Sequence, residues 1–416
     1  MAELHLFIIW KNALYKKNEI LEDINTKFEI LNVYNITWSN KKYSENLSRF
    51  YGVKLPVGCD KEVHCGKGDF LLIIVKDLNP KYDYRRTTAG DELVNINMFD
   101  AKTMYRKWTG GGHKIHCTNS IEESNHDLTL LLDKNIEDYL KYAEENKFNI
   151  NDNKKILHLK KDLIGANGFD SIKNMFYALN NCTNYAILRN YEKLPNEIYL
   201  NKHNDIDLIC DSKEVAAYVL NAKKTQDIEY RVQYHVDVEG KVANFDLRYI
   251  GDKYYDEKIE IDILNRRIWN EKGFYTLSIE DYFYTLLYHA LVHKFEFTDD
   301  YKKRLMKMNN KFTKEICYSN EKSMKFLEEW MIHNRYIMER PIDQTVNFNI
   351  DNIKYVSKLI YRDNIEEIKL KNKVKKLEEE LESIKFSRTW KYTNFIRSIN
   401  KKILLKKGKK VLNTMQ

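Results

Sequence analysis

Two short apolar segments joined by a polar loop place a pair of aspartates in the middle of the chain. The segments cover residues 185–192 and 203–210, and polar turn residues bound both of them. Short apolar runs with such boundaries are typical of buried strands. Because successive side chains of a strand alternate between its faces, Asp205 and Asp207 are predicted to point the same way, with Ile206 pointing into the core.

Paired carboxylates on one face of a strand indicate a cation site. Two adjacent carboxylates repel each other unless a positive charge lies between them, and oxygen ligands at this spacing suit Mg²⁺, which usually also holds substrate phosphates. A third acid, Asp246, lies within the strand-like segment 243–250. The alternative is a solvated strand end that carries acids without binding a metal. The order of elements favours the metal site: strand, loop, strand with both aspartates, amphipathic helix over 212–221, and strand with Asp246.

This order of elements resembles the nucleotidyltransferase fold over roughly residues 165–300. The resemblance implies that Asp205 and Asp207 hold two divalent metal ions, Mg²⁺ or Mn²⁺, and that Asp246 completes the catalytic site. It also implies a nucleoside triphosphate or another nucleotide-activated donor as the co-substrate.

Three further residues near the aspartates are predicted to contact the substrate phosphate: Arg189, Asn190 and His203. The chain departs from the family at the first two, because the family usually has Gly-Gly or Gly-Ser at the end of the first strand. An arginine at this position can grip a phosphate with two parallel hydrogen bonds. The missing glycines put the usual nucleotide loop in doubt.

Length and composition fit a multidomain protein outside the membrane. A chain of 416 residues can bury two or three cores, because single domains mostly run about 100–200 residues. No segment approaches the roughly 20 apolar residues of a membrane-spanning helix, and the first residues lack the basic start and cleavage site of a signal peptide. The six cysteines are scattered, which predicts reduced thiols in the cytoplasm.

The positive net charge belongs to the end of the chain. Ten lysines and arginines and no acidic residue follow Glu382, so residues 1–382 carry about −2 when these ten charges are subtracted from the net charge of +8. The charge of the body therefore argues against a nucleic-acid-binding surface there.

The first 135 residues are predicted to form a ferredoxin-like domain, because strand-like and helical patterns alternate repeatedly. The pattern Ser120-Ile-Glu-Glu123 predicts a capped helix that continues to Leu132. The strands are expected over residues 4–10, 29–38, 70–75 and 113–117, and the other helices over 18–28, 42–51 and 100–108.

Short motifs in this region resemble nucleoside diphosphate kinases. They lie at residues 7–11, 49–52, 68–75 and 114–124. The resemblance implies that His116 matches the histidine that carries the transferred phosphate, that Lys11 matches the lysine of the first strand, and that Arg106 binds phosphate. Cys117 replaces the glycine of the histidine motif, and the Pro-Asp that follows the lysine is missing. The alternatives are a divergent domain that only binds nucleotide or a partner, and an ordinary strand histidine.

The remaining domains are expected as a linker helix over 136–160, a nucleotidyltransferase-like domain over 161–275 and a helical subdomain over 276–345. Ser278 begins a predicted helix that carries His289 and His293 one turn apart. We interpret these histidines as surface or substrate-contact residues in preference to a shared metal site.

The C-terminal part is predicted to be a helix or short coiled coil over 346–386 and a basic amphipathic tail over 387–416. Leu370, Val374, Leu377, Leu381 and Ile384 have the spacing of a coiled coil, which favours a homo-oligomer, although one long helix packed on the body fits equally. Residues 386–393 are similar to tails of bacterial glycosyltransferases that build surface polysaccharides. Aromatic and basic side chains together favour an anionic membrane surface, with RNA as the competing partner.

These patterns predict an α+β protein with metal-dependent nucleotidyl- or phosphoryl-transfer activity. The expected acceptor is a sugar or polyol hydroxyl in capsule-like or teichoic-acid-like polysaccharide synthesis, at the inner face of the cell membrane. Two alternatives come from other classes of protein. One is phosphohistidine transfer by the N-terminal domain, and the other is a non-catalytic, membrane-tethered scaffold for polysaccharide enzymes.

Overall fold

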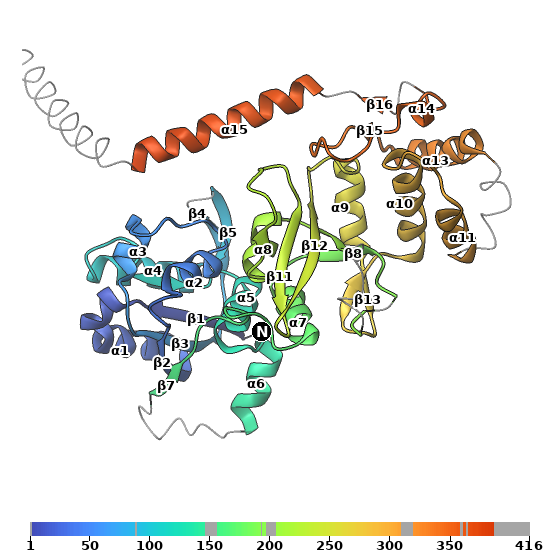
Figure 1. The fold of residues 1–416 in the computed structure, drawn as a ribbon. Helices are drawn as coiled ribbons and strands as arrows, with labels where there is room; N and C mark the ends of the chain where they lie inside the picture. Colours follow the sequence, from blue (N-terminus) through green and yellow to red (C-terminus); the bar gives the residue numbers. More distant parts are fainter. Residues whose placement is uncertain are drawn as a thin grey trace, which may run out of the picture.

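The computed structural model has the mixed α+β fold predicted from the sequence, with two large sheets and a helical C-terminal part (Figure 1). It describes residues 2–87, 90–145, 156–192, 194–196, 205–308, 319–357, 361–362 and 365–386. His203 and the predicted tail, 387–416, lie outside the described residues.

The first sheet has the strand order β6-β1-β3-β2-β7. Four of its strands and two of the helices that connect them follow one another along the chain in the order β1, α1, β2, β3, α4 and β6. β3 lies antiparallel between β1 and β2, and β6 lies antiparallel on the far side of β1. The strands are β1 (Glu3–Ile9), β2 (Glu29–Thr37), β3 (Phe70–Asp77), β6 (Ile115–Cys117) and β7 (Leu157–Lys160).

Both faces of this sheet are covered because its central strands are apolar on both sides. In β1, Phe7 and Ile9 pack on one side of the sheet, and Leu6 and Ile8 pack on the other. The first face is covered by α1 (Lys17–Lys27) and α4 (Ile96–Trp108). The second face is covered by α2 (Tyr43–Phe50), α5 (Ile121–Leu132) and α6 (Ile136–Glu145).

Several elements of the first half have no clear sequence pattern. Residues 157–160, which were predicted as part of the linker helix, form β7 and extend the first sheet beside β2. The hairpin of β4 (Tyr82–Arg86) and β5 (Asp91–Asn95) is mostly exposed, so its residues lack the apolar alternation of a half-buried strand. The other elements not predicted are η1 (Lys11–Lys16) and α3 (Asp60–Cys65).

The second sheet is mixed and has the order β10-β11-β12-β9-β8-β14-β13. Its strands are β8 (Tyr185–Arg189), β9 (Ile206–Cys210), β10 (Lys223–Lys224), β11 (Gln233–Val238), β12 (Lys241–Tyr249), β13 (Ile268–Asn270) and β14 (Phe274–Thr276). One face packs on α7 (Ile172–Cys182) and α8 (Lys213–Val219). The other face packs on α9 (Glu257–Asn265) and α10 (Ile279–Val292).

The helical part around α10 forms one core with α11 (Asp299–Met308), α13 (Asn320–Asn334) and α14 (Ile350–Ile353). A short pair of strands, β15 (Met338–Glu339) and β16 (Tyr361–Arg362), follows. The predicted coiled-coil segment contains the 22-residue helix α15 (Ile365–Phe386). Its heptad residues Leu370, Val374, Leu377 and Leu381 are exposed, so α15 is a helix as predicted and its pairing with a second copy stays a prediction. Among the described helices, none is both long and apolar enough to cross a membrane.

A buried arginine on α2 joins the part of the molecule built on the first sheet to the part built on the second sheet. Arg49 donates hydrogen bonds to the carbonyl oxygens of Ile164 at 2.6 Å, Tyr218 at 2.9 Å and Val219 at 3.1 Å. Burial lowers its pKa to about 10, so the side chain is still charged at neutral pH. One cation therefore satisfies three carbonyl groups at the joint between α2 and the second half.

We expect Arg49→Ala to lower the free energy of unfolding by about 2–3 kcal/mol, because it leaves buried carbonyl groups without a donor. The matched control is Arg86→Ala, since the Arg86 side chain is 79% exposed, and there the change should stay within about 0.5 kcal/mol. Urea unfolding followed by circular dichroism measures both variants. Equal stabilities of the two variants would contradict a joint stabilised by Arg49.

Candidate metal centre

One row of polar side chains crosses three neighbouring strands of the second sheet. Asp207 on β9 is aligned with Asp246 on the parallel strand β12 and with Arg189 on the antiparallel strand β8. Ile206 and Leu208 pack toward α7 and α8, so strand alternation places Asp207 on the opposite face, toward α9 and α10. The predicted orientation of Ile206 into the core is confirmed.

A bulge in β8 brings Arg189 to this row. The pairing of β8 with β9 shifts between Ile187 and Arg189, so Leu188 is an extra residue in β8. Regular alternation would place Arg189 on the face of Ile187, away from the aspartates, and the extra residue reverses this. Arg189 then donates a hydrogen bond of 2.9 Å to Oδ1 of Asp207.

Asn190, directly after β8, has an uncommon backbone conformation. Its φ angle is +64°, in the left-handed region. Glycine adopts this region at no steric cost, and asparagine is one of the few other residues that visit it routinely. The chain therefore changes direction after β8 at a residue that tolerates this conformation, and Asn190 itself is exposed.

Asp246 on β12 has one carboxylate oxygen that the surrounding described residues leave without a hydrogen bond. Its Oδ1 atom is buried and has no hydrogen-bond partner among the described residues. Burial, followed by repulsion from Asp207, raises its pKa to about 6, and Asp205 adds to this repulsion. Arg248, two residues further along the same strand, partly opposes the shift. Burial and the neighbouring carboxylates together therefore disfavour the charged form of Asp246 in the metal-free protein.

A chain of hydrogen bonds leads from the aspartates to α10. Arg189 donates at 3.1 Å to the hydroxyl of Tyr254, which lies 2.5 Å from Nδ1 of His289. Burial holds the pKa of His289 well below its usual 6.5, so its ring is neutral. Because the Tyr254 hydroxyl accepts from Arg189, its own proton is directed to Nδ1.

The structure corrects the predicted surface position of the two histidines on α10. His289 is 6% exposed and His293 is 4% exposed. The ring of His293 lies against the ring of Tyr254, with 4.0 Å between the centroids, and Arg248 lies 4.1 Å above the same ring. Both histidines therefore belong to the buried wall of the site.

Sequence reasoning missed Arg248 and Tyr254. The alternation of β12 could have indicated Arg248, which lies two residues after Asp246 and so on the same face. No sequence pattern indicates Tyr254, since it follows the strand in an irregular segment. Asp205 comes directly before β9 and is partly exposed, at the outer edge of the row.

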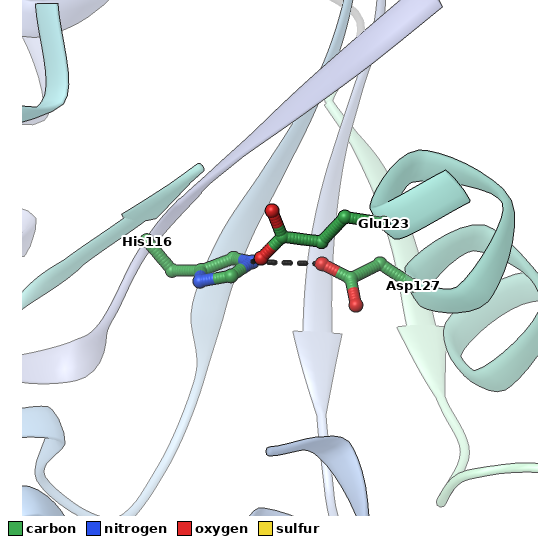
Figure 2. A group of neighbouring side chains, drawn as sticks. All are labelled: His116, Glu123 and Asp127. Atoms are coloured by element: carbon green, nitrogen blue, oxygen red, sulfur yellow. Dashed lines mark hydrogen bonds and ion pairs between the residues drawn. The ribbon is translucent and has the colours of Figure 1, made fainter. Parts of the chain in front are cut away.

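The N-terminal region contains a second group of candidate residues. His116 on β6 lies with its Nε2 atom 2.7 Å from Oδ2 of Asp127 on α5, and both side chains are buried (Figure 2). Arg106 donates from Nε to the carbonyl oxygen of Ile115, so it lies beside the same strand. Lys11 is exposed in η1, where its charge contributes to lowering the pKa of Asp69.

Comparisons of this chain with family models, with curated proteins and with solved structures give no match.

Proposed function

We propose that the chain is a metal-dependent transferase of nucleotidyl or phosphoryl groups, with its active site at Asp205, Asp207 and Asp246. The observation that carries the proposal is a buried carboxylate oxygen of Asp246, which has no hydrogen-bond partner among the residues that the structure describes, on a residue in register with Asp207. Two aligned carboxylates offer the oxygen ligands that Mg²⁺ or Mn²⁺ requires. The residues present therefore fit a divalent cation.

The fold-level part of the proposal is supported by strand order. The mixed arrangement of β8, β9 and β12, with acids on the second and third strands, is what a nucleotidyltransferase-like domain requires. The order β6-β1-β3-β2 and its crossovers through α1 and α4 are those of a ferredoxin-like domain. Both assignments are proposals that rest on topology.

In this mechanism, Asp205, Asp207 and Asp246 would hold the cation. When bound, the cation supplies positive charge to the phosphate oxygens of the donor and to the attacking hydroxyl. Asp246, as the third carboxylate of the site, would also accept the proton of the acceptor hydroxyl. Arg189 would exchange its bond to Asp207 for a phosphate oxygen once a cation neutralises the aspartates.

The donor would be a nucleoside triphosphate or a nucleotide-activated compound, and the acceptor a sugar or polyol of a surface polysaccharide. We place the protein in the cytoplasm at the inner face of the membrane, held there by its basic tail. The support for this placement is the concentration of ten cations after Glu382. An anionic lipid surface attracts such a segment by about 1 kcal/mol per basic residue near the surface.

A second candidate function is phosphohistidine transfer at His116. The hydrogen bond from Nε2 to Asp127 favours it, because a carboxylate on one ring nitrogen orients the other as a nucleophile. In this reaction Nδ1 would form a bond to the γ-phosphorus as the bond to the nucleoside diphosphate breaks.

One experiment separates these functions. The full chain is incubated with Mg²⁺ and labelled nucleoside triphosphate, in wild-type form and as the variants Asp207→Asn and His116→Ala. We expect transfer to soluble polyol or sugar acceptors that Asp207→Asn reduces at least about 1000-fold, since the cation contributes several kcal/mol. His116→Ala should leave it unchanged. An acid-labile label on the protein that His116→Ala removes would favour the second function, and full transfer by Asp207→Asn would refute the first.

A further inference from the structure

The turn between β6 and α5 brings three possible metal ligands together. Glu123 and Asp127 lie four residues apart on α5 and so share one face of that helix. His116 on β6 faces them (Figure 2). Its Nε2 atom lies 2.7 Å from Oδ2 of Asp127 and 4.0 Å from Oε1 of Glu123. One donor atom from each residue lies within 4.8 Å of the other two.

Each carboxylate is held by its outer oxygen, so its other oxygen faces His116. Oε2 of Glu123 accepts from the backbone N–H of Asn119 at 2.6 Å. The backbone N–H of Glu123 donates to the hydroxyl of Ser120, the N-cap residue of α5, at 3.2 Å. Oδ1 of Asp127 lies 2.9 Å from Nδ1 of His126. The hydrogen bonds at the start of α5 therefore also position a ligand.

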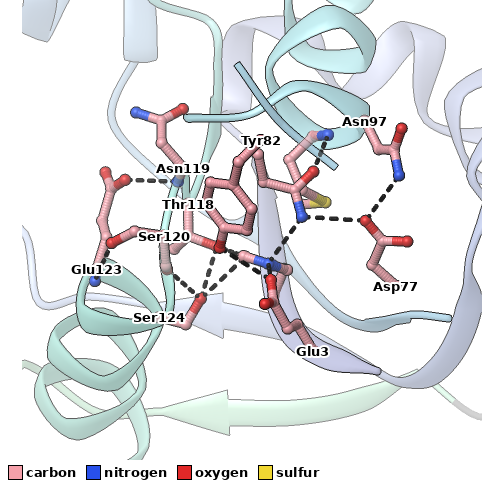
Figure 3. A network of polar contacts seen from close by, with 12 residues as sticks. Glu3, Asp77, Tyr82, Asn97, Thr118, Asn119, Ser120, Glu123 and Ser124 are labelled. Carbon is pink, nitrogen blue, oxygen red and sulfur yellow. Dashed lines mark hydrogen bonds and ion pairs between the residues drawn. The ribbon is translucent and has the colours of Figure 1, made fainter. Parts of the chain in front are cut away.

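A buried polar network fixes the turn that carries these residues (Figure 3). Ser124 donates to the Thr118 hydroxyl at 2.9 Å, and Nδ1 of His5 on β1 lies 3.1 Å from the same oxygen. The backbone N–H of Leu6 also donates to Thr118 at 3.2 Å. The residues between β6 and α5 are thus tied to the neighbouring strand, which fixes the distance between His116 and the helix face.

The two carboxylates of this group lie close together at the edge of the buried region. The Asp127 side chain is 2% exposed and the Glu123 side chain is 33% exposed. Neighbouring carboxylates repel each other, and a metal ion between them would remove that repulsion.

We propose that His116, Glu123 and Asp127 form a binding site for a divalent transition-metal ion such as Zn²⁺. One imidazole nitrogen and two carboxylate oxygens are ligands that zinc accepts, with bonds of about 2.0–2.2 Å, and small side-chain movements bring the three atoms to such a centre. The Glu123 side chain is partly exposed and so leaves an approach for the ion. This site is distinct from the aspartate row on the second sheet, whose oxygen ligands favour Mg²⁺.

The experiment uses the full chain after chelation, in an excess of Mg²⁺ that occupies the aspartate row. Isothermal titration with Zn²⁺ should show one equivalent bound. Glu123→Gln and Asp127→Asn should each weaken this binding at least about 10-fold, the loss typical even of residues behind the ligands. The matched control is Glu122→Gln, an exposed residue on the same helix, which should bind Zn²⁺ as the unchanged protein does. Asp207→Asn should also have no effect.

A second measurement identifies the imidazole ligand and does not depend on affinity alone. Co²⁺ bound in place of Zn²⁺ should give visible absorption bands that change in His116→Gln, with circular dichroism as the check that this variant is folded. Absence of stoichiometric Zn²⁺ binding overturns the proposal. So does binding that Glu122→Gln weakens as much as Glu123→Gln, or binding that Asp207→Asn removes. A phosphohistidine that forms equally with and without stoichiometric Zn²⁺ also overturns it, because zinc on Nε2 would leave the ring proton on Nδ1, the nitrogen that would otherwise attack the phosphorus.

Discussion

Asp246→Asn is expected to abolish transfer while making the metal-free protein more stable. The asparagine keeps the size of the side chain and removes its charge, so the repulsion from Asp207 disappears together with a metal ligand. Activity should fall at least about 1000-fold, because the cation contributes several kcal/mol to such reactions. Loss of activity with a gain in stability is the combination expected of a functional charge in an unfavourable position.

The stability gain of Asp246→Asn should depend on pH. The pKa of Asp246 is raised from its usual 3.8 to about 6 in the folded protein, so ionisation there opposes folding. The destabilisation of the folded state by Asp246 is absent below about pH 4, grows between about pH 4 and pH 6, and reaches its full value above pH 6. At pH 7 the variant should be more stable by about 2–3 kcal/mol, and at pH 4 by almost nothing.

Thermal and urea unfolding without metal at pH 7 and pH 4 measure this difference. Mg²⁺ should raise the melting temperature of the unchanged protein and have little effect on Asp246→Asn. Asp227→Asn, at an exposed position on the same half of the molecule, is the control and should change neither property. A destabilised Asp246→Asn protein at pH 7 would show that the carboxylate has a stabilising partner, and the metal site would lose its main support.

Arg189→Met should destabilise the metal-free protein by about 3–5 kcal/mol. The Arg189–Asp207 ion pair is buried, with 8% and 10% of the two side chains exposed, and removal of one partner leaves an uncompensated charge. Here the cost is increased by Asp246, because the two aligned carboxylates then lose the guanidinium group of Arg189 and keep only the partial compensation by Arg248. Methionine keeps most of the apolar volume of the arginine stem, so the loss reports mainly on the charge.

Mg²⁺ should recover a large part of the stability of Arg189→Met, because a divalent cation replaces the guanidinium as the partner of the aspartates. The control is Lys223→Met, which breaks an ion pair with Asp237 whose side chains are 70% and 50% exposed, and which should cost no more than about 0.5 kcal/mol. Unfolding curves with and without Mg²⁺ compare the two. If Mg²⁺ stabilises Arg189→Met no more than it stabilises Lys223→Met, the aspartate row does not bind the ion.

Local patterns in the sequence were sufficient for most helices and strands near the sites. Ser120, Ser212 and Ser278 cap the helices that they were predicted to begin, because an N-cap depends only on residues a few positions away. The common face of Asp207 and Asp246 also follows from strand alternation and strand order. The predicted strands β1, β2, β3, β8, β9 and β12 are present with shifted ends.

The sequence by itself therefore determined which strands carry Asp207 and Asp246 and which face of the sheet these side chains occupy. The strands follow from short apolar runs, and the face follows from the alternation of side chains along each strand. Tertiary structure alone decided that Arg189 joins them. With strict alternation the Arg189 side chain would lie on the face of the sheet opposite the aspartates. The extra residue Leu188 shifts it to the face of the aspartates. It also decided that Tyr254 and His289, 35 residues apart, complete the wall of the site. Such contacts depend on how α10 packs against the sheet, and no local repeat in the chain records that packing.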